Sequence, residues 1–293
     1  MKNNTKIYKI INIIVILISF VFLGKIMFEN GAVAISFFLK SNKVWSIIIV
    51  IIIFCLIHII KLIRFYFILL EEKLELKRFV RIYIKTTFVN IVLPFKIGEV
   101  FRFYCYSNET NNYKIGFTSI LVERFLDTCA LLLLILPFTI FVDKSILSVI
   151  YVFVIFVILG FIIYNMFYPM YNYINTFLIL NTTSRKSLKI LKVLEDANEW
   201  YIYMKKLIKG RFKLVFLLSL LAWIMEYLFV YILSTILGVK FLLETFNIYI
   251  ISAFLGREDN LLQMYKLIGA ATFGAIMLIA YAKSFKRGEN NEK

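Results

Sequence analysis

Long apolar runs dominate the chain and predict transmembrane helices. A helix needs about 20 mostly apolar residues to cross a bilayer, and five stretches meet that requirement comfortably. They are Ile10 to Phe28, Val44 to Leu70, Phe117 to Val142, Ile146 to Phe167 and Leu214 to Leu237. A sixth stretch, Leu267 to Tyr281, is shorter. This pattern predicts an all-α integral membrane protein with about six transmembrane helices, forming a single polytopic membrane domain over residues 1–293.

Two further apolar segments predict re-entrant or broken helices. Phe79 to Tyr106 and Phe241 to Leu255 are each interrupted by polar or helix-breaking residues. Pro94 removes a backbone donor and disfavours helix at Leu93, so we expect the first segment to break there. A new helix starting near Phe95 would direct free amides and its positive dipole end towards an anion such as a lipid phosphate. The alternative is an interfacial amphipathic helix that begins with Pro94.

The distribution of basic residues predicts the orientation in the membrane. The N-terminal tail, the segment 183–213 and the tail after Tyr281 are rich in Lys and Arg, so we expect all three to be cytoplasmic. The first broken segment must then enter from and return to the cytoplasm, and the second must enter from and return to the outside. This suggests two half-units of opposite topology, as in the inverted repeats of transporters. Segment 183–213 also has the pattern of a basic amphipathic helix on the inner leaflet. The simpler interpretation is a loop that follows the positive-inside rule.

The composition excludes a water-soluble enzyme. Of the 293 residues, 61% are hydrophobic and 18% are charged, and the net charge is +16. On so apolar a chain, this positive charge favours an anionic membrane lipid over nucleic acid as a partner. The three cysteines are isolated and there is one histidine, so the usual zinc, haem and thiol-redox patterns are absent from the sequence. We therefore expect no metal site, no cofactor and no catalytic residues of those kinds.

Polar residues interrupt the first broken segment at positions that are costly in a membrane. The candidates are Asn90, Pro94, Gly98, Glu99 and Arg102. Glu99 and Arg102 are three residues apart and could form a partly buried pair on one helix face.

A second charged cluster, Glu123, Arg124 and Asp127, lies near the start of the third apolar stretch. Each charge costs about 2.5–3.5 kcal/mol at the centre of a transmembrane helix, so these side chains should face the protein interior. Arg124 and Asp127 can pair, and the remaining carboxylate needs a cation from elsewhere, with Arg64, Arg102 and Lys96 as candidates. Both a structural ion cluster and a proton or headgroup relay fit this pattern.

Arg64 and Glu226 complete the candidate site residues. Arg64 lies towards the inner end of the second stretch, where a long basic side chain could also extend to the interface. Glu226 lies in the middle of a span and should be protonated or paired. It could line a substrate pathway or hold two helices together.

Two motifs resemble the lysylphosphatidylglycerol synthase transmembrane family, also called flippase-like, which forms the N-terminal part of multiple peptide resistance factors. They are N-I-V-L-P-F-K-I-G-E-V-F-R at 90–102 and V-E-R-F-L-D at 122–127. The resemblance covers about residues 10–281 and marks eight matching positions: Asn90, Pro94, Gly98, Glu99, Arg102, Glu123, Arg124 and Asp127. The chain departs from the family in the late re-entrant region, where a P-G-G-x-G-x-x-E-like stretch is replaced by F-L-G-R-E-D at 254–259.

The resemblance implies a plasma-membrane translocase for an anionic or aminoacyl-modified phospholipid, with a role in antimicrobial peptide resistance. The fused resistance factors continue into a soluble aminoacyl transferase domain, whereas this sequence stops at Lys293, so we do not expect lysyl transfer from it. A different class of function is a non-transporting membrane partner of a lipid-modifying or surface-glycan assembly enzyme. Intramembrane carboxylates leave open whether the chain is itself an enzyme.

Overall fold

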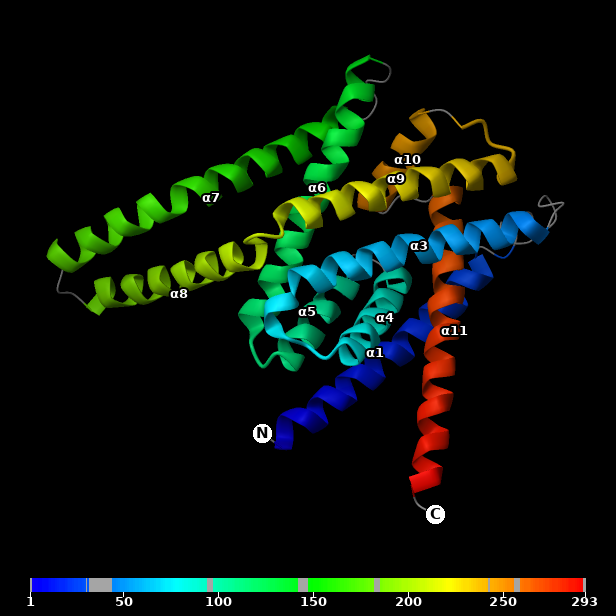
Figure 1. Cartoon of the computed structure of the whole chain (residues 1–293), viewed down its shortest axis with the longest axis horizontal. Helices are drawn as coiled ribbons and strands as arrows, with labels where there is room; N and C mark the ends of the chain where they lie inside the picture. The colour runs from blue at the N-terminus through cyan, green and yellow to red at the C-terminus, as the bar shows by residue number, and fades with distance from the viewer. Residues whose placement is uncertain are drawn as a thin grey trace.

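The computed structural model describes residues 2–29, 31, 44–93, 97–141, 147–181, 185–241, 243–255 and 259–291 (Figure 1). Within these ranges the chain forms α-helices and one short 3-10 helix, and no strand. The elements are α1 (Lys2–Glu29), α3 (Val44–Ile68), η1 (Leu70–Glu72), α4 (Leu76–Val92), α5 (Ile97–Glu109), α6 (Tyr113–Phe141), α7 (Leu147–Asn181), α8 (Arg185–Ile208), α9 (Phe212–Leu237), α10 (Leu243–Leu255) and α11 (Asn260–Asn291). The predicted all-α fold is confirmed.

Five helices in the described part of the chain are long and apolar enough to cross a membrane. These spans are Ile10–Phe28, Trp45–Ile68, Val149–Asn181, Phe212–Leu237 and Asn260–Ile279. Many of their large apolar side chains point outwards; Val21 is 72% exposed and Val152 is 63% exposed. Such surfaces suit contact with lipid chains. The chain is therefore a multi-pass membrane protein. The relation of its halves as inverted repeats stays a prediction.

The first interrupted segment forms two helices, α4 and α5, as the sequence predicts. α4 ends at Val92, and Leu93 has an extended backbone, with φ −80° and ψ 139°, which is the conformation expected of a residue before proline. α5 begins at Ile97. The stretch Pro94 to Lys96 lies outside the described residues.

The second interrupted segment contains α10, whose 13 residues extend roughly 20 Å at 1.5 Å per residue. This is shorter than the hydrocarbon core of a bilayer, about 30 Å. α11 follows and begins at Asn260, earlier than the predicted start at Leu267. Asp259 explains the early start because its carboxylate accepts a hydrogen bond from the amide of Leu262 at 3.3 Å, as an N-cap residue does.

α7 is longer than predicted. The sequence pattern placed the end of this span at Phe167, before Pro169, but the helix continues to Asn181. α8 packs beside the proline: the hydroxyl of Tyr201 donates to the carbonyl of Tyr164 at 3.0 Å, and its ring stacks on Phe167 with centroids 4.8 Å apart. Packing on a neighbouring helix can therefore hold α7 together where the proline removes a backbone hydrogen bond.

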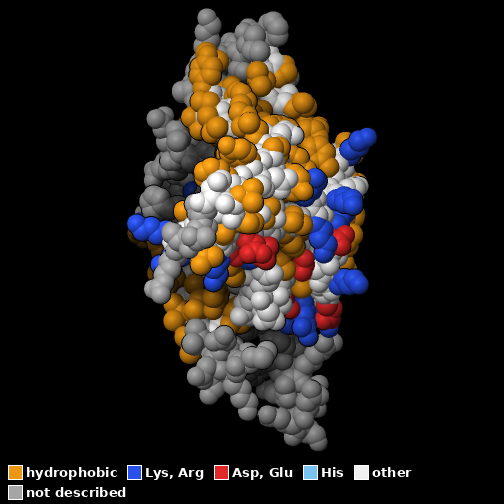
Figure 2. All heavy atoms as spheres, turned by 90° about the vertical axis from the view of Figure 1, so that its left-hand side faces the viewer, with side chains coloured by type: hydrophobic (Ala, Val, Ile, Leu, Met, Phe, Trp, Pro, Cys, Tyr) orange, Lys and Arg blue, Asp and Glu red, His pale blue; other side chains and the backbone are white. Residues whose placement is uncertain are grey.

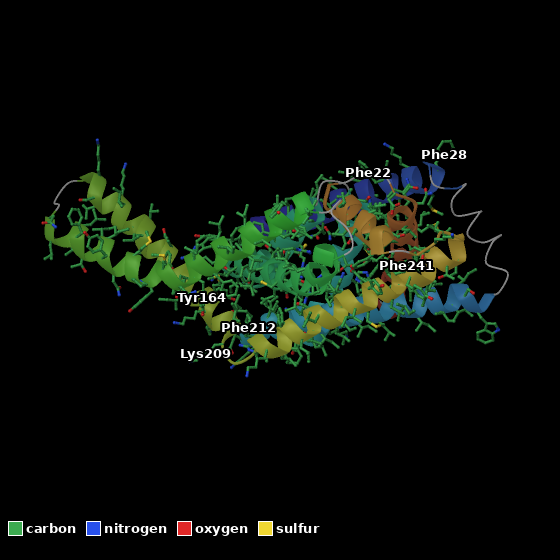
Figure 3. The ribbon with its side chains drawn as sticks, turned by 90° about the horizontal axis from the view of Figure 1, so that it is seen from above. Phe22, Phe28, Tyr164, Lys209, Phe212 and Phe241 are labelled. Atoms are coloured by element: carbon green, nitrogen blue, oxygen red, sulfur yellow. The ribbon has the colours of Figure 1, made fainter. Side chains whose placement is uncertain are left out.

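α7 and α8 form an antiparallel arm that projects from the rest of the molecule (Figures 1 and 3). In Figure 3 the arm extends beyond Tyr164, while Lys209 and Phe212 mark the turn into α9. Figure 2 faces this end of the molecule and shows apolar side chains over its upper part, with charged side chains across its middle and right-hand edge. Lys114 on α6 pairs with Glu199 on α8, which attaches the arm to the body.

The body of the molecule brings four helices, α3, α5, α6 and α9, to the candidate site. α3 and α9 lie side by side along much of their length, and α6 packs against both (Figure 1). α5 packs between α4 and α6, and α4 in turn contacts α1 and α11. This arrangement places the inner face of α6, which carries the second charged motif, opposite α3 on one side and α5 on the other.

Candidate functional site

Arg64 on α3 lies at the centre of a buried ion network. Its side chain is 1% exposed, and its Nη2 is 2.6 Å from Oε1 of Glu123 and 3.2 Å from Oδ2 of Asp127. Nη1 also pairs with Asp127 and donates to the hydroxyl of Ser219 on α9 at 3.1 Å. The alternative in which Arg64 extends to the interface is therefore wrong, and this residue joins three helices.

Glu123 lies between two arginines. While its Oε1 faces Arg64, its Oε2 is 2.7 Å from Nη2 of Arg102 on α5. The guanidinium of Arg102 lies over the ring of Phe65, 3.8 Å from the centroid, which is a favourable cation–π position. The pair between Glu99 and Arg102 that their spacing suggested is replaced by pairs between α5 and α6.

Arg124 and Glu99 form the accessible edge of the network. Nη2 of Arg124 is 3.1 Å from Oε1 of Glu99, and the two side chains are 39% and 20% exposed. Nη1 of Arg124 also lies 3.7 Å from Oδ2 of Asp127, as the three-residue spacing predicts. A small charged group can therefore approach this edge, whereas Arg64 and Glu123 are sealed inside.

The network balances its own charges. Arg64, Arg102 and Arg124 oppose Glu99, Glu123 and Asp127, three cations against three anions. Glu123 and Asp127 are four residues apart on one face of α6 and would repel each other, but Arg64 bridges them. Mutual neutralisation makes it possible for six charged groups to lie within a membrane domain.

A second ion pair lies one helical turn from the network. Lys61 on α3 pairs with Glu226 on α9, and the carboxylate side chain is 7% exposed. The sequence predicted that Glu226 would be protonated or paired but did not identify Lys61 as its partner. The available signal was the three-residue spacing of Lys61 and Arg64, which places both on the face of α3 that meets α9.

Trp223 was also missed as part of this site. Its indole Nε1 donates to the backbone carbonyl of Asp127 at 3.2 Å, so α9 contacts the charged motif of α6 through both Trp223 and Ser219. The sequence pattern gave no indication that Trp223 contacts α6. Every residue has a backbone carbonyl, so the sequence cannot indicate which residue accepts such a hydrogen bond.

Asn90 and Gly98 form a close backbone contact beside the network. A Cβ added to Gly98 would overlap the backbone and Cβ of Asn90, so only glycine lets α4 and α5 approach this closely. Gly98 precedes Glu99 in the first turn of α5, where backbone amides lack helical partners. Pro94, the remaining candidate, lies outside the described residues.

The structure thus brings most of the candidates into one arrangement. A buried layer, Arg64, Glu123 and Arg102, supports an accessible pair, Arg124 and Glu99, near the N-terminal end of α5. Arginine recognises phosphate through parallel hydrogen bonds, and a helix N-terminus attracts anions. The accessible edge therefore offers an arginine, a carboxylate and a helix N-terminus that can exchange ionic partners with a charged group.

Comparison with known proteins identifies the family. A family model described as the lysylphosphatidylglycerol synthase TM region matches residues 10–256. No curated protein and no solved structure matches the chain. The matched region includes both charged motifs and the helices that pair them, α3, α5, α6 and α9. The chain belongs to the lysylphosphatidylglycerol synthase transmembrane family.

Proposed function

We propose that this protein is a flippase-like translocase that moves an anionic or aminoacyl-modified phospholipid across the plasma membrane. Its termini and α8 would lie on the cytoplasmic side, where the Lys and Arg residues of these segments favour the anionic leaflet. Movement of an aminoacylated lipid to the outer leaflet would reduce the negative surface charge that attracts cationic antimicrobial peptides, so a role in resistance to them would follow.

The contrast between the two layers of the ion network carries this proposal. A cluster that served only to join helices would be sealed throughout, as Arg64 and Glu123 are, with 1% and 3% of their side chains exposed. Arg124 is 39% exposed although it belongs to the same network. An accessible arginine with an exchangeable partner in a membrane domain suits a ligand that is itself anionic.

The geometry suggests how a headgroup would bind. Its phosphate would replace Glu99 as the partner of Arg124 and would meet the first-turn amides of α5. Glu99, once released, could accept the ammonium group of an aminoacyl headgroup. With an aminoacyl lipid, this exchange of partners keeps the charges of both Arg124 and Glu99 neutralised. Arg64, Glu123 and Arg102 would keep α6 and α5 in place during the exchange.

Reconstitution tests the proposal directly. The full chain would be placed in liposomes with fluorescent phosphatidylglycerol or its lysyl derivative, and movement scored by dithionite quenching. We expect wild-type protein to move at least one of the two lipids, and Arg124→Gln and Glu99→Gln to lose most of that activity. Arg78→Gln is the matched control, because exposed Arg78 on α4 pairs with Glu75 and Glu109, outside the network. Equal rates in all four proteins would overturn the site assignment.

A non-transporting role is the second candidate, because the arm carries exposed lysines. Lys205, Lys206 and Lys209 are exposed near the end of α8 and could contact a lipid-modifying or surface-glycan assembly enzyme. Reversal of all three to Glu separates the two functions. If the protein is a translocase, the variant should retain lipid movement in liposomes. If it is a partner protein, the variant should lose its support of the lipid-modifying or glycan-assembly enzyme in cells, although its ion network remains intact.

A further inference from the structure

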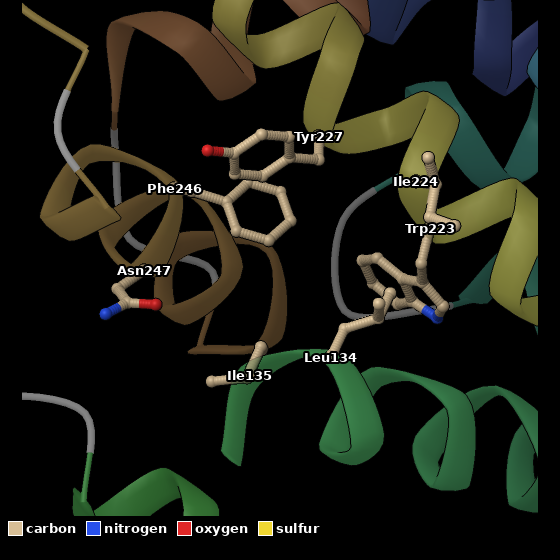
Figure 4. Close-up of a pocket in the computed structure, with 7 residues that line it drawn as sticks. All are labelled: Leu134, Ile135, Trp223, Ile224, Tyr227, Phe246 and Asn247. Atoms are coloured by element: carbon tan, nitrogen blue, oxygen red, sulfur yellow. The ribbon is translucent and has the colours of Figure 1, made fainter. Parts of the chain in front are cut away.

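An apolar cavity of about 230 Å³ lies between α6, α9 and α10. Its lining consists of Leu134, Ile135, Trp223, Ile224, Tyr227, Phe246 and Asn247 (Figure 4). Tyr227 and Phe246 face each other across one wall, with ring centroids 5.0 Å apart and planes at 77°. α6 supplies the opposite wall through Leu134 and Ile135. Aromatic and aliphatic side chains therefore make up most of the cavity wall.

The volume and the apolar lining of the cavity limit the kinds of molecule that it can bind. Apolar cavities exclude water and bind hydrocarbon, and this one belongs to a membrane protein surrounded by lipid chains. Its volume lies below the roughly 300–1,000 Å³ of pockets that hold whole drug-sized ligands. A section of a single linear chain fits better than a bulky ring system or a complete lipid.

One residue, Trp223, contacts both the cavity and the ion network. Trp223 lines the cavity and also donates its indole N–H to the carbonyl of Asp127. On α6, Leu134 follows Asp127 by two turns, roughly 10 Å along the helix axis. Asp127 in turn contacts Arg124 at the accessible edge. A phospholipid with its phosphate at Arg124 can therefore reach the cavity with the chain attached to the same glycerol.

We propose that this cavity holds one acyl chain of the phospholipid whose headgroup binds at Arg124 and Glu99. The inference rests on the proposed headgroup site and extends it, since it makes a diacyl phospholipid the substrate class. Trp223 would lie between the bound headgroup and the bound acyl chain. A free phosphate or a water-soluble headgroup would lack the chain contact and would bind weakly.

Photo-crosslinking tests this without requiring transport. The full chain in nanodiscs would be irradiated with phosphatidylglycerol that carries a diazirine in one acyl chain, and the adducts located by mass spectrometry. We expect adducts at the cavity residues of α6, α9 and α10. Leu134→Trp fills the cavity and should reduce these adducts to background. Leu133→Trp is the matched control, because the neighbouring side chain is 57% exposed on the outer surface, and it should leave them unchanged.

Three results would overturn the proposal: adducts distributed evenly over the lipid-exposed face of α7, full labelling in Leu134→Trp, or full labelling in Arg124→Gln. The last variant tests whether headgroup and chain belong to one lipid. If Leu134→Trp fails to fold, Ile224→Phe fills the same cavity from the partly exposed side of α9. Labelling that depends on Arg124 without any lipid movement would support the chain site and would reject translocation.

Discussion

The guanidinium of Arg64 on α3 lies 2.6 Å from the carboxylate of Glu123 on α6, and their side chains are 1% and 3% exposed. Burial of two charges is costly, and their attraction compensates only where the remaining donors and acceptors also find partners. Asp127 and Ser219 accept further hydrogen bonds from Arg64, and Arg102 forms an ion pair with the second carboxylate oxygen of Glu123. This pair therefore determines how α3, α5, α6 and α9 assemble around the candidate site.

Arg64→Gln should be strongly destabilising. The change leaves Glu123 and Asp127 facing each other without the cation that bridges them, and removal of one partner from a buried pair costs about 3–5 kcal/mol. Thermal unfolding in detergent, followed by size-exclusion chromatography, measures the loss. Arg64→Lys should recover only part of the stability, because an ammonium group cannot span two carboxylates as the guanidinium fork does.

The cost of Arg64→Gln should come from the unpaired carboxylates rather than from lost packing. Arg64→Met combined with Asp127→Asn removes one cation and one anion, leaves Glu123 with Arg102 and Glu99 with Arg124, and should unfold at a temperature closer to that of wild type. Arg78→Gln breaks an exposed pair and should change stability by less than about 1 kcal/mol. Equal unfolding temperatures for Arg64→Gln and Arg78→Gln would contradict the buried network.

Glu99→Gln and Glu123→Gln should separate lipid movement from stability. Glu123 is buried between two arginines, so its neutralisation should lower both stability and lipid movement. Glu99 is 20% exposed and contacts one arginine, so Glu99→Gln should lower lipid movement while stability changes by about 1 kcal/mol or less. Liposome assays and thermal unfolding on the same preparations test this. Parallel losses in both variants would assign the accessible pair a structural role only.

Gly98→Val should separate α4 from α5. The added side chain would overlap Asn90, and excess volume in a packed contact costs about 1–3 kcal/mol. Because Glu99 follows directly, lipid movement should fall as well. Gly24→Ala on α1 is the control: a Cβ there meets no atom within 4 Å, and alanine favours helix over glycine by up to about 1 kcal/mol. An unchanged unfolding temperature in Gly98→Val would argue against the close helix contact.

Tyr203 on α8 should ionise only at unusually alkaline pH. Burial raises its pKa, and the hydrogen bond that its hydroxyl donates to Glu72 at 2.8 Å raises it further. A raised pKa in the folded protein means that this contact stabilises the docked arm at neutral pH and is lost as pH rises above the range in which a free tyrosine ionises. The absorbance difference at the tyrosinate band between wild type and Tyr203→Phe measures this ionisation.

Glu72→Gln identifies the contribution of the carboxylate to that shift. The neutral amide no longer repels the phenolate, so the pKa of Tyr203 should move back towards its ordinary value. The arm should remain docked at neutral pH through the pairs of Arg211 with Glu71 and of Lys114 with Glu199. An identical titration in the Glu72→Gln background would mean that burial alone raises the pKa.

Hydropathy by itself determined most of the helices, since apolar runs of membrane-spanning length leave few other structures for the backbone. Local chemistry also determined the end of α4, where the residue before Pro94 takes an extended conformation. At Pro169, by contrast, α8 packs against α7, and the helix continues to Asn181, beyond the predicted end of the span at Phe167. A proline removes one backbone hydrogen bond from a helix. Whether the helix ends there depends on how well a neighbouring helix packs against it.

The sequence also predicted that Glu123, Arg124 and Asp127 face the protein interior, because their charges are costly in lipid. The structure buries Glu123 and Asp127, whereas Arg124 is 39% exposed. Only the tertiary structure decided the partners. Arg64 is separated from Glu123 by 59 positions, and Lys61 from Glu226 by 165, so spacing along one helix could not pair them. Local pairing favoured Glu99 with Arg102, but packing of α5 on α6 gave each a partner across the interface. A buried charge needs a partner because burial removes it from water. Which partner it finds depends on which helices pack against it.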